Sequence, residues 1–535
     1  MNPARYSTLS RMLCVALLLV LTAPLPGQDQ APAGLEVYRA LQRFELTGGS
    51  AVAENLELKR DRVTMVFNGR FYFEAPVAGR VRGAVFQGNG TFRAEVPPIE
   101  FERENLQRIL KATAVESNFR TAVLRFSDDT FDLIGKNVSS AIAPREAQEL
   151  ATEIQTRLLR ETGANLAARL TISILNAENP GFFLAQFDKG QRDRFTFLFD
   201  HQARIPVGTF DINGGEKGLI FQHRGALAGN DVWMAFYSLA DFERGRVEYS
   251  DVEDQVAIPR YTMDIDVRNP GKILKVSARM DFVAAKDALR AIPLRLNESL
   301  GEHDSERLKK ALRVKAARFA DGSLVEAVQE EWEGGFTLLL PAPRAKGEKF
   351  AIVIEYEGDF MFDSPTIADC FYPRVTTEWY PRHGYLHRSA FDLTFHHRKK
   401  YRIAAVGARV REELIPGGDS EMISQWRVDS PVPMATFGVG DFERHVERIA
   451  TTGFPVEFHS LPAHLVVLKE DFVLAELMNC LQYFSTIFGP YPYPTFSAMY
   501  HPRPAGLPLC RSSSALVHIA SLGQSSSCRP NILPK

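Results

Sequence analysis

Residues 261–282 read YTMDIDVRNPGKILKVSARMDF, and this stretch decides the fold class. Apolar and polar residues alternate from Tyr261 to Val267, a turn follows at Asn269–Gly271, and the alternation resumes from Leu274 to Phe282. Because a period of two gives an extended strand one apolar and one polar face, the stretch predicts an antiparallel strand pair. Later apolar runs separated by Gly and Pro predict further strands at 336–340, 350–356, 391–395 and 401–406. We therefore predict a mainly β fold of stacked antiparallel sheets.

The sequence from about residue 34 to residue 246 is also mostly β in character. Asn68-Gly69 separates two apolar runs, and so does Asn89-Gly90. Because Asn-Gly tolerates the positive φ angles of a two-residue hairpin, we predict a turn at each dipeptide. Ser127–Asp129 is predicted to join a strand at 123–126 to a second strand at 130–133. This region carries no catalytic signature.

Two helices are predicted. The first has Pro144 at its first helical position and ends at Gly163, with Leu150, Ile154 and Leu158 recurring at four-residue spacing. In the second, apolar residues follow helical spacing over 472–487, acidic residues 470 and 471 suit its positive end, and Gly489 with Pro490 ends it. The chain therefore changes from β to α near residue 464.

Length and composition limit the class of protein. The 535 residues suggest about three or four domains, at about 150 residues each. A 45% hydrophobic and 24% charged composition is globular, which excludes a disordered, collagen-like or polytopic membrane protein. The net charge of -2 leaves no overall basic field, so we expect no nucleic-acid partner.

Residues 1–28 have the features of a secretory signal peptide. Arg5 and Arg11 precede the apolar run Met12–Leu21, and small residues follow. The run is shorter than the roughly 20 apolar residues that span a bilayer. No Ala-x-Ala site is present, and Cys14 lies inside the run, which disfavours a lipoprotein. We expect export to the periplasm or the extracellular space, with no membrane span after signal removal.

The segment Phe488–Pro494, FGPYPYP, follows the second helix directly and resembles the start of the catalytic domain of the alanyl aminopeptidase family. These are zinc aminopeptidases that also include the leukotriene-A hydrolases. Upstream, Trp379–Pro381, Ala390–Phe395 and Pro431–Phe442 resemble the opening loop, long strand and exit strand of that family's saddle-shaped N-terminal β domain. The resemblance covers about residues 257–500.

The resemblance implies a domain order for the rest of the chain. Residues 251–462 would be an aminopeptidase-like N-terminal β domain, and residues 463–504 would begin an α-helical, thermolysin-like catalytic domain. Residues 29–250 would be an extra β-rich domain without an assigned role. The expected fold is two antiparallel β-rich domains followed by the first helix of a truncated catalytic domain.

The family's chemistry needs residues that this sequence lacks. A His-Glu-x-x-His helix and a later Glu hold zinc, and the Glu between the histidines accepts a proton from the zinc-bound water. None of the 12 histidines belongs to such a motif, and Arg503–Pro508 stands where a Gly-x-Met-Glu-Asn loop would bind the substrate's amine. We therefore assign no catalytic, cofactor-binding or metal residue. No cofactor is expected in this chain, although full-length members of the family carry zinc and act on peptides or proteins with free N-termini.

Residues 505–535 differ from the rest of the chain. They contain no Asp, Glu, Phe, Tyr or Trp, but they include seven serines together with Cys510 and Cys528. We interpret this segment as a shifted reading frame that truncates the protein. The alternative is a genuine disordered tail.

Several weaker patterns have a structural interpretation beside a functional one. His383 and His387 would share zinc if they lay on one helix turn, but Pro381 and Gly384 favour a loop. The basic run 396–400 is typical of a solvated turn rather than an anion site.

Cysteines and loop motifs give the remaining weak patterns. Cys370 and Cys480 are predicted to be buried structural cysteines rather than nucleophiles. Cys510 and Cys528 would pair only in an exported chain. Asp211–Glu216 lacks the twelfth-position Glu of a calcium loop and predicts a turn. Asn137–Ser139 is a glycosylation sequon only in a host that glycosylates.

These observations lead to a primary interpretation and two alternatives. The primary one is an exported zinc-aminopeptidase-like protein, truncated before its zinc site and therefore inactive alone. The first alternative is a non-catalytic β-rich binding module of the cell envelope, and the second is an unrelated periplasmic β-sandwich. A helix at 472–487 with an exposed apolar face would favour the first interpretation.

Overall fold

The computed structural model describes residues 33–162, 165–190, 193–205, 210, 212, 214–225, 229–245, 255–297, 311–331, 333–363, 368–374, 378–384, 387–415, 420–461, 469–501, 511–513 and 516–520. Their fold is mainly β, as predicted, with several antiparallel sheets and few helices. The expected signal peptide, residues 1–28, lies outside the described residues. No helix in the described ranges is both long and apolar enough to cross a bilayer.

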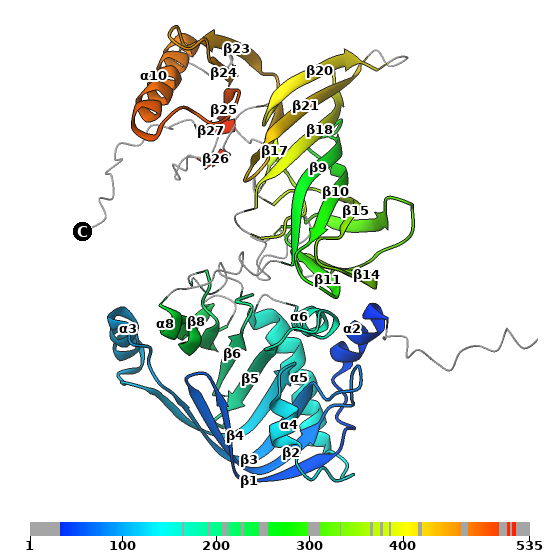
Figure 1. Cartoon of the computed structure of the whole chain (residues 1–535), viewed down its shortest axis with the longest axis vertical. Coiled ribbons are helices and arrows are strands. Elements are labelled where there is room, and N and C mark those ends of the chain that lie inside the picture. The colour runs from blue at the N-terminus through cyan, green and yellow to red at the C-terminus, as the bar shows by residue number, and fades with distance from the viewer. Residues whose placement is uncertain are drawn as a thin grey trace, which may run out of the picture.

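The N-terminal part is one eight-stranded antiparallel sheet whose strands follow one another in chain order (Figure 1). Its strands are β1 (Ser50–Arg60), β2 (Val63–Phe73), β3 (Gly83–Ala94), β4 (Val115–Phe126), β5 (Phe182–Asp188), β6 (Arg194–Asp200), β7 (Gly218–His223) and β8 (Asn230–Phe236). Its helices are α2 (Gly34–Arg43), α3 (Glu100–Leu110), α4 (Thr130–Ile134), α5 (Arg145–Thr162), α6 (Leu166–Leu175) and α8 (Leu239–Arg244). The predicted helix over 144–163 is confirmed as α5.

The two faces of this sheet have different cores. One face is filled by phenylalanine rings, of which Phe67, Phe86 and Phe119 are fully buried and lie 4.9–5.9 Å apart between ring centres. The opposite face packs against the apolar sides of α2, α5 and α6. Aromatic rings pack well edge to face, so the phenylalanine-rich face forms a dense core.

The two Asn-Gly dipeptides are not turns, so the predicted hairpins at those positions are wrong. Asn68-Gly69 lies inside β2 and Asn89-Gly90 lies inside β3, and the two strands pair Asn68 with Asn89. The side-chain oxygen of Asn68 accepts a hydrogen bond from the backbone N–H of Asn55 at 2.7 Å, at the point where β1 shifts register. The chain turns instead at Asp61-Arg62, between β1 and β2.

The predicted strand at 130–133 is the short helix α4. The Asp128 carboxylate accepts hydrogen bonds from both the backbone N–H of Thr130, at 3.0 Å, and the Thr130 hydroxyl, at 2.5 Å. An acidic side chain that satisfies a free N–H at a helix start favours helix over strand. Sequence reasoning treated Ser127–Asp129 as a simple turn and missed these two hydrogen bonds.

The second part of the chain contains three sheets. The largest has the order β12-β15-β10-β9-β18-β21-β20, and all its neighbours are antiparallel except β9 and β18. Its strands are β9 (Val256–Asp266), β10 (Leu274–Ala284), β12 (Arg313–Phe319), β15 (Lys349–Gly358), β18 (Ser389–Arg398), β20 (Ala408–Leu414) and β21 (Glu421–Val432). The smaller sheets contain β11 (Leu289–Leu294), β13 (Glu326–Val328) and β14 (Phe336–Arg344), and then β16 (Met361–Asp363), β17 (Cys370–Pro373), β19 (Arg402–Ala405) and β22 (Phe437–Gly440).

The strand pair predicted from residues 261–282 is confirmed as β9 and β10. Tyr261, at the centre of β9, stacks on Phe391 with 5.1 Å between ring centres and donates a hydrogen bond to the Pro381 carbonyl. Trp379 is fully buried beside them and donates its indole N–H to the Ala435 carbonyl at 2.9 Å. The 379–381 loop therefore belongs to the core of this part.

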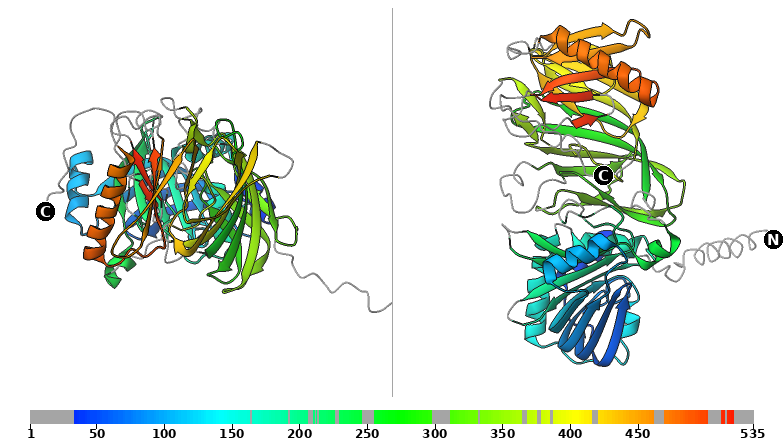
Figure 2. Two further views of the ribbon diagram at one scale, coloured as in Figure 1. Left: turned by 90° about the horizontal axis from the view of Figure 1, so that it is seen from above. Right: turned by 90° about the vertical axis from the view of Figure 1, so that its left-hand side faces the viewer.

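The third part follows in one mixed sheet and one helix. Its elements are β23 (Glu443–Arg448), β24 (Pro455–Ser460), α10 (Glu470–Phe488), β25 (Phe496–His501), β26 (Arg511–Ser513) and β27 (Leu516–Ala520). Strands β24, β25 and β27 run parallel. The predicted second helix is confirmed as α10, which packs on β24 (Figure 2). Strands β26 and β27 fall within residues 505–535, for which the sequence predicted no regular structure.

The first two parts are joined through helices α2 and α6, which lie between the N-terminal sheet and strands β11 and β14 (Figure 1). Asn176, which ends α6, accepts hydrogen bonds from the N–H groups of Arg290 and Ala291 and donates one to the Ala291 carbonyl. Apolar residues of β11 and β14, Ala291 and Leu339, share one buried cluster with α2 and α6. These contacts bring β11 to the end of the N-terminal sheet, where the cavity described next is found.

Candidate functional site

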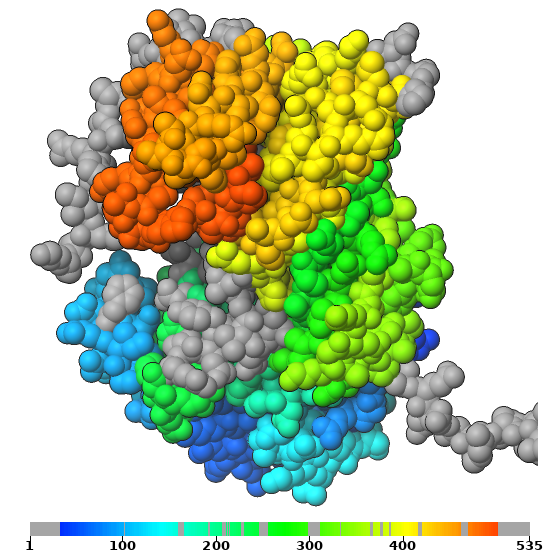
Figure 3. All heavy atoms as spheres, turned by 45° about the horizontal axis from the view of Figure 1, so that its top comes forward, coloured from blue at the N-terminus to red at the C-terminus, as the bar shows by residue number. Residues whose placement is uncertain are grey.

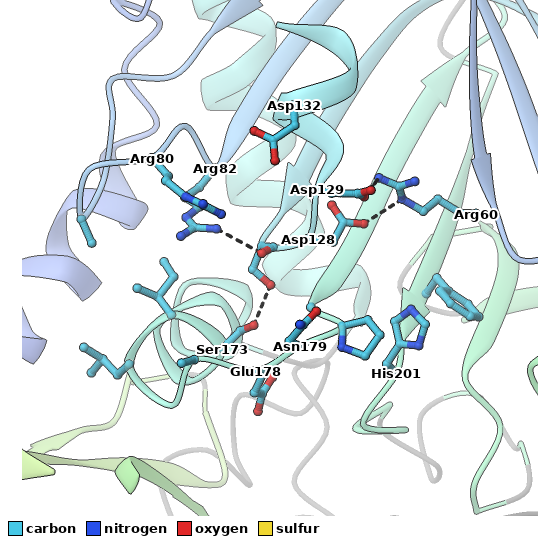
Figure 4. A pocket seen from close by; sticks show the side chains of 18 of the residues that line it. Arg60, Arg80, Arg82, Asp128, Asp129, Asp132, Ser173, Glu178, Asn179 and His201 are labelled. Carbon is cyan, nitrogen blue, oxygen red and sulfur yellow. Dashed lines mark hydrogen bonds and ion pairs between the residues drawn. The ribbon is translucent and has the colours of Figure 1, made fainter. Parts of the chain in front are cut away.

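A polar cavity of about 1040 Å³ lies at the end of the N-terminal sheet, against β11 (Figure 4). It is built from segments far apart in sequence. They are the end of β1, the loop before β3, the turn after β4, the end of α6 with the loop that follows it, the end of β6, and Arg290 of β11.

One wall of the cavity is an ion-pair cluster around Arg60. Its Nε lies 2.7 Å from Oδ2 of Asp128, and its Nη2 lies 2.7 Å from Oδ1 of Asp129. The same Nη2 donates to the Thr130 hydroxyl at 2.7 Å, and Nη1 donates to the Lys59 carbonyl at 2.8 Å. Arg60 and the two aspartates therefore form ion pairs with one another.

The opposite wall carries Arg80 and Arg82, whose guanidinium groups lie side by side (Figure 4). Arg82 is buried and donates from Nη1 to the Ser127 carbonyl at 3.1 Å. Burial, and next the positive charge of Arg80, lowers the pKa of Arg82. Neither arginine forms an ion pair with any residue that the structure describes.

A buried network supports the floor of the cavity. Arg169 of α6 makes two 2.7 Å hydrogen bonds to the carboxylate of Asp200 and a third, also 2.7 Å, to Glu178. Burial alone would raise the pKa of Asp200, but the Arg169 guanidinium lowers it overall. The Ser127 and Ser173 hydroxyls bond each other at 2.6 Å, which ties the turn after β4 to α6.

His201 directly follows the last residue of β6 and is half-buried. Its ring packs edge to face on Phe199, with 4.7 Å between the ring centres. Burial lowers the pKa of His201, so the ring is neutral at physiological pH. The cavity thus combines a satisfied acidic cluster, two arginines that lack an ion pair in the described ranges, and some apolar surface. This arrangement suits the binding of an anion, because charge-assisted hydrogen bonds from guanidinium groups recognise carboxylates and phosphates.

The two histidines singled out in the sequence have structural surroundings. Nε2 of His383 accepts from the backbone N–H of Gln255 at 3.3 Å, so Nδ1 carries the hydrogen that it donates to the Pro293 carbonyl at 2.8 Å. Its ring centre lies 6.2 Å from that of His387. In the parts of the chain that the structure describes, no cluster of three or more His, Cys, Asp or Glu could hold a metal.

Side chains of the basic run 396–400 contact polar residues of the same β domain. His396 contacts Asp264 at 2.9 Å, buried His397 contacts the Ser424 hydroxyl at 2.7 Å, and Lys400 lies 3.0 Å from Asp369. Burial lowers the pKa of His397. These contacts give the run a structural role at the end of β18.

The cysteine prediction is confirmed for one residue and wrong for the other. Cys370 is buried in β17, and burial raises its pKa to about 12, which keeps the thiol protonated. Cys480 is exposed on α10. Cys510 and Cys528 lie outside the described residues, as do Asp211 and Asn213 of the weak calcium-loop pattern.

Sequence reasoning did not find the cavity. One signal was available, because Arg80 and Arg82 are two residues apart and therefore lie on the same side of an extended segment. The other walls come from residues as distant as Arg60 and Arg290, which only the tertiary fold brings together.

Comparison with known proteins gives matches to solved structures. No protein-family model and no curated protein matches the chain. It is similar to an M1 zinc metallopeptidase from Deinococcus radiodurans, at 20% identity and a TM-score of 0.39. A variant of that enzyme bound to a Tyr-Ser-Ala substrate, and a two-domain M1 variant bound to L-arginine, each show 19% identity and the same TM-score. Each match covers 50% of this chain and 60% of the neighbour, so the chain spans less than two thirds of those proteins.

Proposed function

We propose that these 535 residues form the β-rich, non-catalytic part of an exported zinc-aminopeptidase-like protein and do not hydrolyse peptides by themselves. The observation that carries the proposal is the exposed apolar surface of α10. Five large apolar or aromatic side chains of this helix are more than half exposed: Phe472 57%, Tyr483 63%, Phe484 54%, Ile487 53% and Phe488 80%. Phe472, Tyr483 and Ile487 lie on the outer face, whereas Phe484 and Phe488 follow buried Leu481 by three and seven residues and continue its side toward the end of the helix. A solvated helix normally presents polar residues on its outer face, so this face is suited to packing against further polypeptide.

The opposite side of α10 is already used. Val473, Leu474 and Leu481 are buried against β24 in one apolar cluster (Figure 3 shows the orange segment at the surface). The helix is therefore apolar on two sides, which is typical of an element between two layers. In the resembled family this helix begins the helical catalytic domain, and we propose that a helical module of that type covers the exposed side.

The segment after α10 fixes the helix to the β domain. The Tyr493 hydroxyl accepts a hydrogen bond from Arg388 at 3.0 Å. Tyr491 meets Phe454 and Phe496 edge to face at 5.7 and 5.6 Å. This packing of the Gly-Pro-Tyr-Pro segment supports a rigid junction between α10 and the β domain.

The proposed lack of activity rests on the sequence, which contains no His-Glu-x-x-His. Without two histidines on one helix face and the Glu between them, zinc-activated water has neither a site nor a base. A complete catalytic unit would bind the zinc and would act on peptides or proteins with free N-termini.

Zinc content and peptidase activity test this part of the proposal. The purified 535-residue chain is analysed for zinc and incubated with alanyl and leucyl reporter substrates. We expect substoichiometric zinc and no turnover above buffer. Stoichiometric zinc together with turnover would contradict the proposal.

Self-association tests the role of the α10 face. Light scattering is measured over a concentration series for the natural chain and for a Phe484→Ser/Phe488→Ser variant. We expect the natural chain to associate and the variant to associate less, because its exposed apolar area is smaller. Ile142→Ser is the control, since Ile142 is 93% exposed and lies on no helix. A natural chain that stays monomeric would argue against a packing face. So would a Phe484→Ser/Phe488→Ser variant that associates as much as the natural chain.

Export is tested by the N-terminus of the mature protein. We expect protein recovered from the periplasm or the medium to begin near residue 28, because a secretory signal is removed on export. An intact N-terminus on cytoplasmic protein would contradict export.

The cavity at the end of the N-terminal sheet favours a second candidate, a non-catalytic binding module of the cell envelope. Its guanidinium pair is far from α10 in sequence and requires no metal. The peptidase test does not separate the two candidates, but self-association does, because a binding module is expected to be soluble and monomeric.

A further inference from the structure

We propose that the cavity binds the carboxylate of a peptide, held by the guanidinium groups of Arg80 and Arg82. The anion site rests on the geometry of these two arginines alone. The choice of a peptide as the molecule that bears the carboxylate rests on the proposed function.

Arg82 is a buried cation without an opposite charge at contact distance. Its side chain is among the buried charged groups, at 8% exposure. A charged side chain is rarely buried unless it is paired, because desolvation is costly. Its bond to the Ser127 carbonyl satisfies one of five N–H groups. An anion in the cavity would place an opposite charge at contact distance from the guanidinium.

Arg80 strengthens this inference because it places a second positive charge beside the first. Both side chains line the cavity and converge on the same space (Figure 4). Two adjacent guanidinium groups repel each other, and an anion bound between them would turn that repulsion into attraction. Two forks of N–H donors also match the two oxygens of a carboxylate.

Asp128 and Asp132 of the cavity, together with buried Glu74, attract the Arg82 guanidinium and partly offset the effect of burial on its pKa, but none of them forms an ion pair with it in the described residues. Asp128 and Asp129 are held by Arg60, and Glu178 is held by Arg169. Asp132 is exposed at the start of α4. These nearby carboxylates disfavour a dianion, so a singly charged carboxylate suits the site better than phosphate.

The remaining walls suit a ligand with apolar groups. Ile174, Leu175, Pro180 and Phe199 line the cavity beside the polar residues. Its volume of about 1040 Å³ is at the upper end of small-molecule sites, which run to about 1,000 Å³. A peptide of a few residues would place its carboxylate on the arginines and its side chains on the apolar wall.

Calorimetric titration of the full chain tests the proposal. The probe is N-acetyl-alanyl-leucine, which has a free carboxylate, and the matched probe is its C-terminal amide. We expect saturable binding of the acid, and binding at least about tenfold weaker for the amide, since each charge-assisted hydrogen bond is strong. Equal binding of the two probes, or no saturable binding of the acid, would overturn the proposal.

Variants assign the binding to the two arginines. Arg80→Gln and Arg82→Gln are each expected to weaken binding of the acid about tenfold or more. The control is Arg93→Gln, on β3, whose exposed side chain pairs with Glu116, and it should bind like the natural chain. Arg80 is exposed, so its variant is expected to fold and carries the test if Arg82→Gln does not. Unchanged binding by Arg80→Gln would contradict the assignment.

Two further probes separate the anion site from the peptide assignment. Inorganic phosphate that binds more tightly than the acid would overturn the choice of carboxylate. Propionate that binds as tightly as the dipeptide would overturn the choice of peptide while leaving the anion site in place. Because none of these titrations involves zinc or hydrolysis, their failure is distinguishable from a failure of the proposed function.

Discussion

The Tyr38 hydroxyl donates a 2.5 Å hydrogen bond to Oε1 of Glu330, and this bond joins helix α2 to the segment between β13 and β14. Asn165, which caps α6, donates to the same hydroxyl at 2.9 Å and to Oε2 of Glu333 at 3.0 Å. Gln42 donates to both Tyr38 and Glu330. The contact between the first two parts of the chain is therefore a polar network beside the apolar packing of α2 and α6 on β11 and β14.

Removal of the Tyr38 hydroxyl should weaken this contact. We expect Tyr38→Phe to lower the free energy of unfolding by about 1–3 kcal/mol, because the lost hydrogen bond is made to a carboxylate. A double-mutant cycle with Glu330→Gln, measured by urea unfolding, should give a positive coupling energy. Tyr72→Phe is the control, since Tyr72 is half-buried and its hydroxyl forms no hydrogen bond within the described residues. Zero coupling would mean that the bond contributes nothing to the contact.

Glu333 should make the stability of the same network depend on pH. Burial raises its pKa from 4.5 to about 7, against the opposing hydrogen bond from Asn165. The folded chain therefore holds a proton that the unfolded chain has already released between these two values. This stabilisation is complete below about pH 4.5 and is lost as the pH rises through about 7.

Replacement of Glu333 by Gln should remove this dependence. We expect the free energy of unfolding of the natural chain to fall by about 1–3 kcal/mol more than that of Glu333→Gln between about pH 5 and about pH 8. Urea unfolding at several pH values measures the difference. Glu331→Gln, at an exposed neighbour, should keep the slope of the natural chain. Parallel curves for the natural chain and Glu333→Gln would contradict the assignment.

The pair Arg125 and Glu74 should be sensitive to the loss of one partner. Both side chains are 1% exposed, with 2.9 Å between Nη1 and Oε1, and Arg125 also donates to the Leu41 carbonyl and stacks on Phe44. We expect Glu74→Ala to cost about 3–5 kcal/mol, because it leaves a buried charge without its counter-ion.

Two further variants define this prediction. A Glu74→Leu/Arg125→Met double variant should recover part of the loss, since a buried pair replaced by apolar residues leaves no isolated charge. Arg93→Ala, which breaks a pair about 60% exposed on both sides, should cost less than about 1 kcal/mol. If chemical unfolding shows that Glu74→Ala and Arg93→Ala lower the free energy of unfolding equally, the buried pair is no more sensitive than the exposed one and the prediction is wrong.

Local patterns in the sequence predicted several elements of this fold. The alternation in residues 261–282 corresponds to β9 and β10, and four-residue spacing corresponds to α5 and α10. These patterns were sufficient because burial on one face is a local property of a strand or helix. The side of α10 that lies exposed could not be told apart from the buried side, since both carry large apolar residues.

Features that depend on distant segments were missed. The cavity needs Arg60, Arg82, Glu178 and Arg290 in one place, and no spacing in the sequence relates them. Asn68-Gly69 was misinterpreted because a turn dipeptide and a close cross-strand contact both require glycine. Only the partner strand, with its own Asn-Gly, distinguishes the two cases.

Gly69 and Gly88 face each other across β2 and β3, and each should resist substitution. A Cβ added at Gly69 would lie 2.7 Å from the Gly88 Cα and closer still to the Gln87 carbonyl oxygen, and a Cβ at Gly88 would meet the backbone of residues 68 and 69. We expect each alanine variant to cost about 1–3 kcal/mol or more, because the strand backbones must separate. The double variant should cost less than the sum of the two single-variant costs. Once one added Cβ has pushed the strand backbones apart, the second Cβ meets less resistance at the same place. Gly79→Ala is the control: its added Cβ meets nothing within 4 Å, so only its positive φ of 77° costs energy, about 1–2 kcal/mol. If chemical unfolding shows Gly69→Ala to be no worse than Gly79→Ala, the two strands are not held at this separation by their glycines.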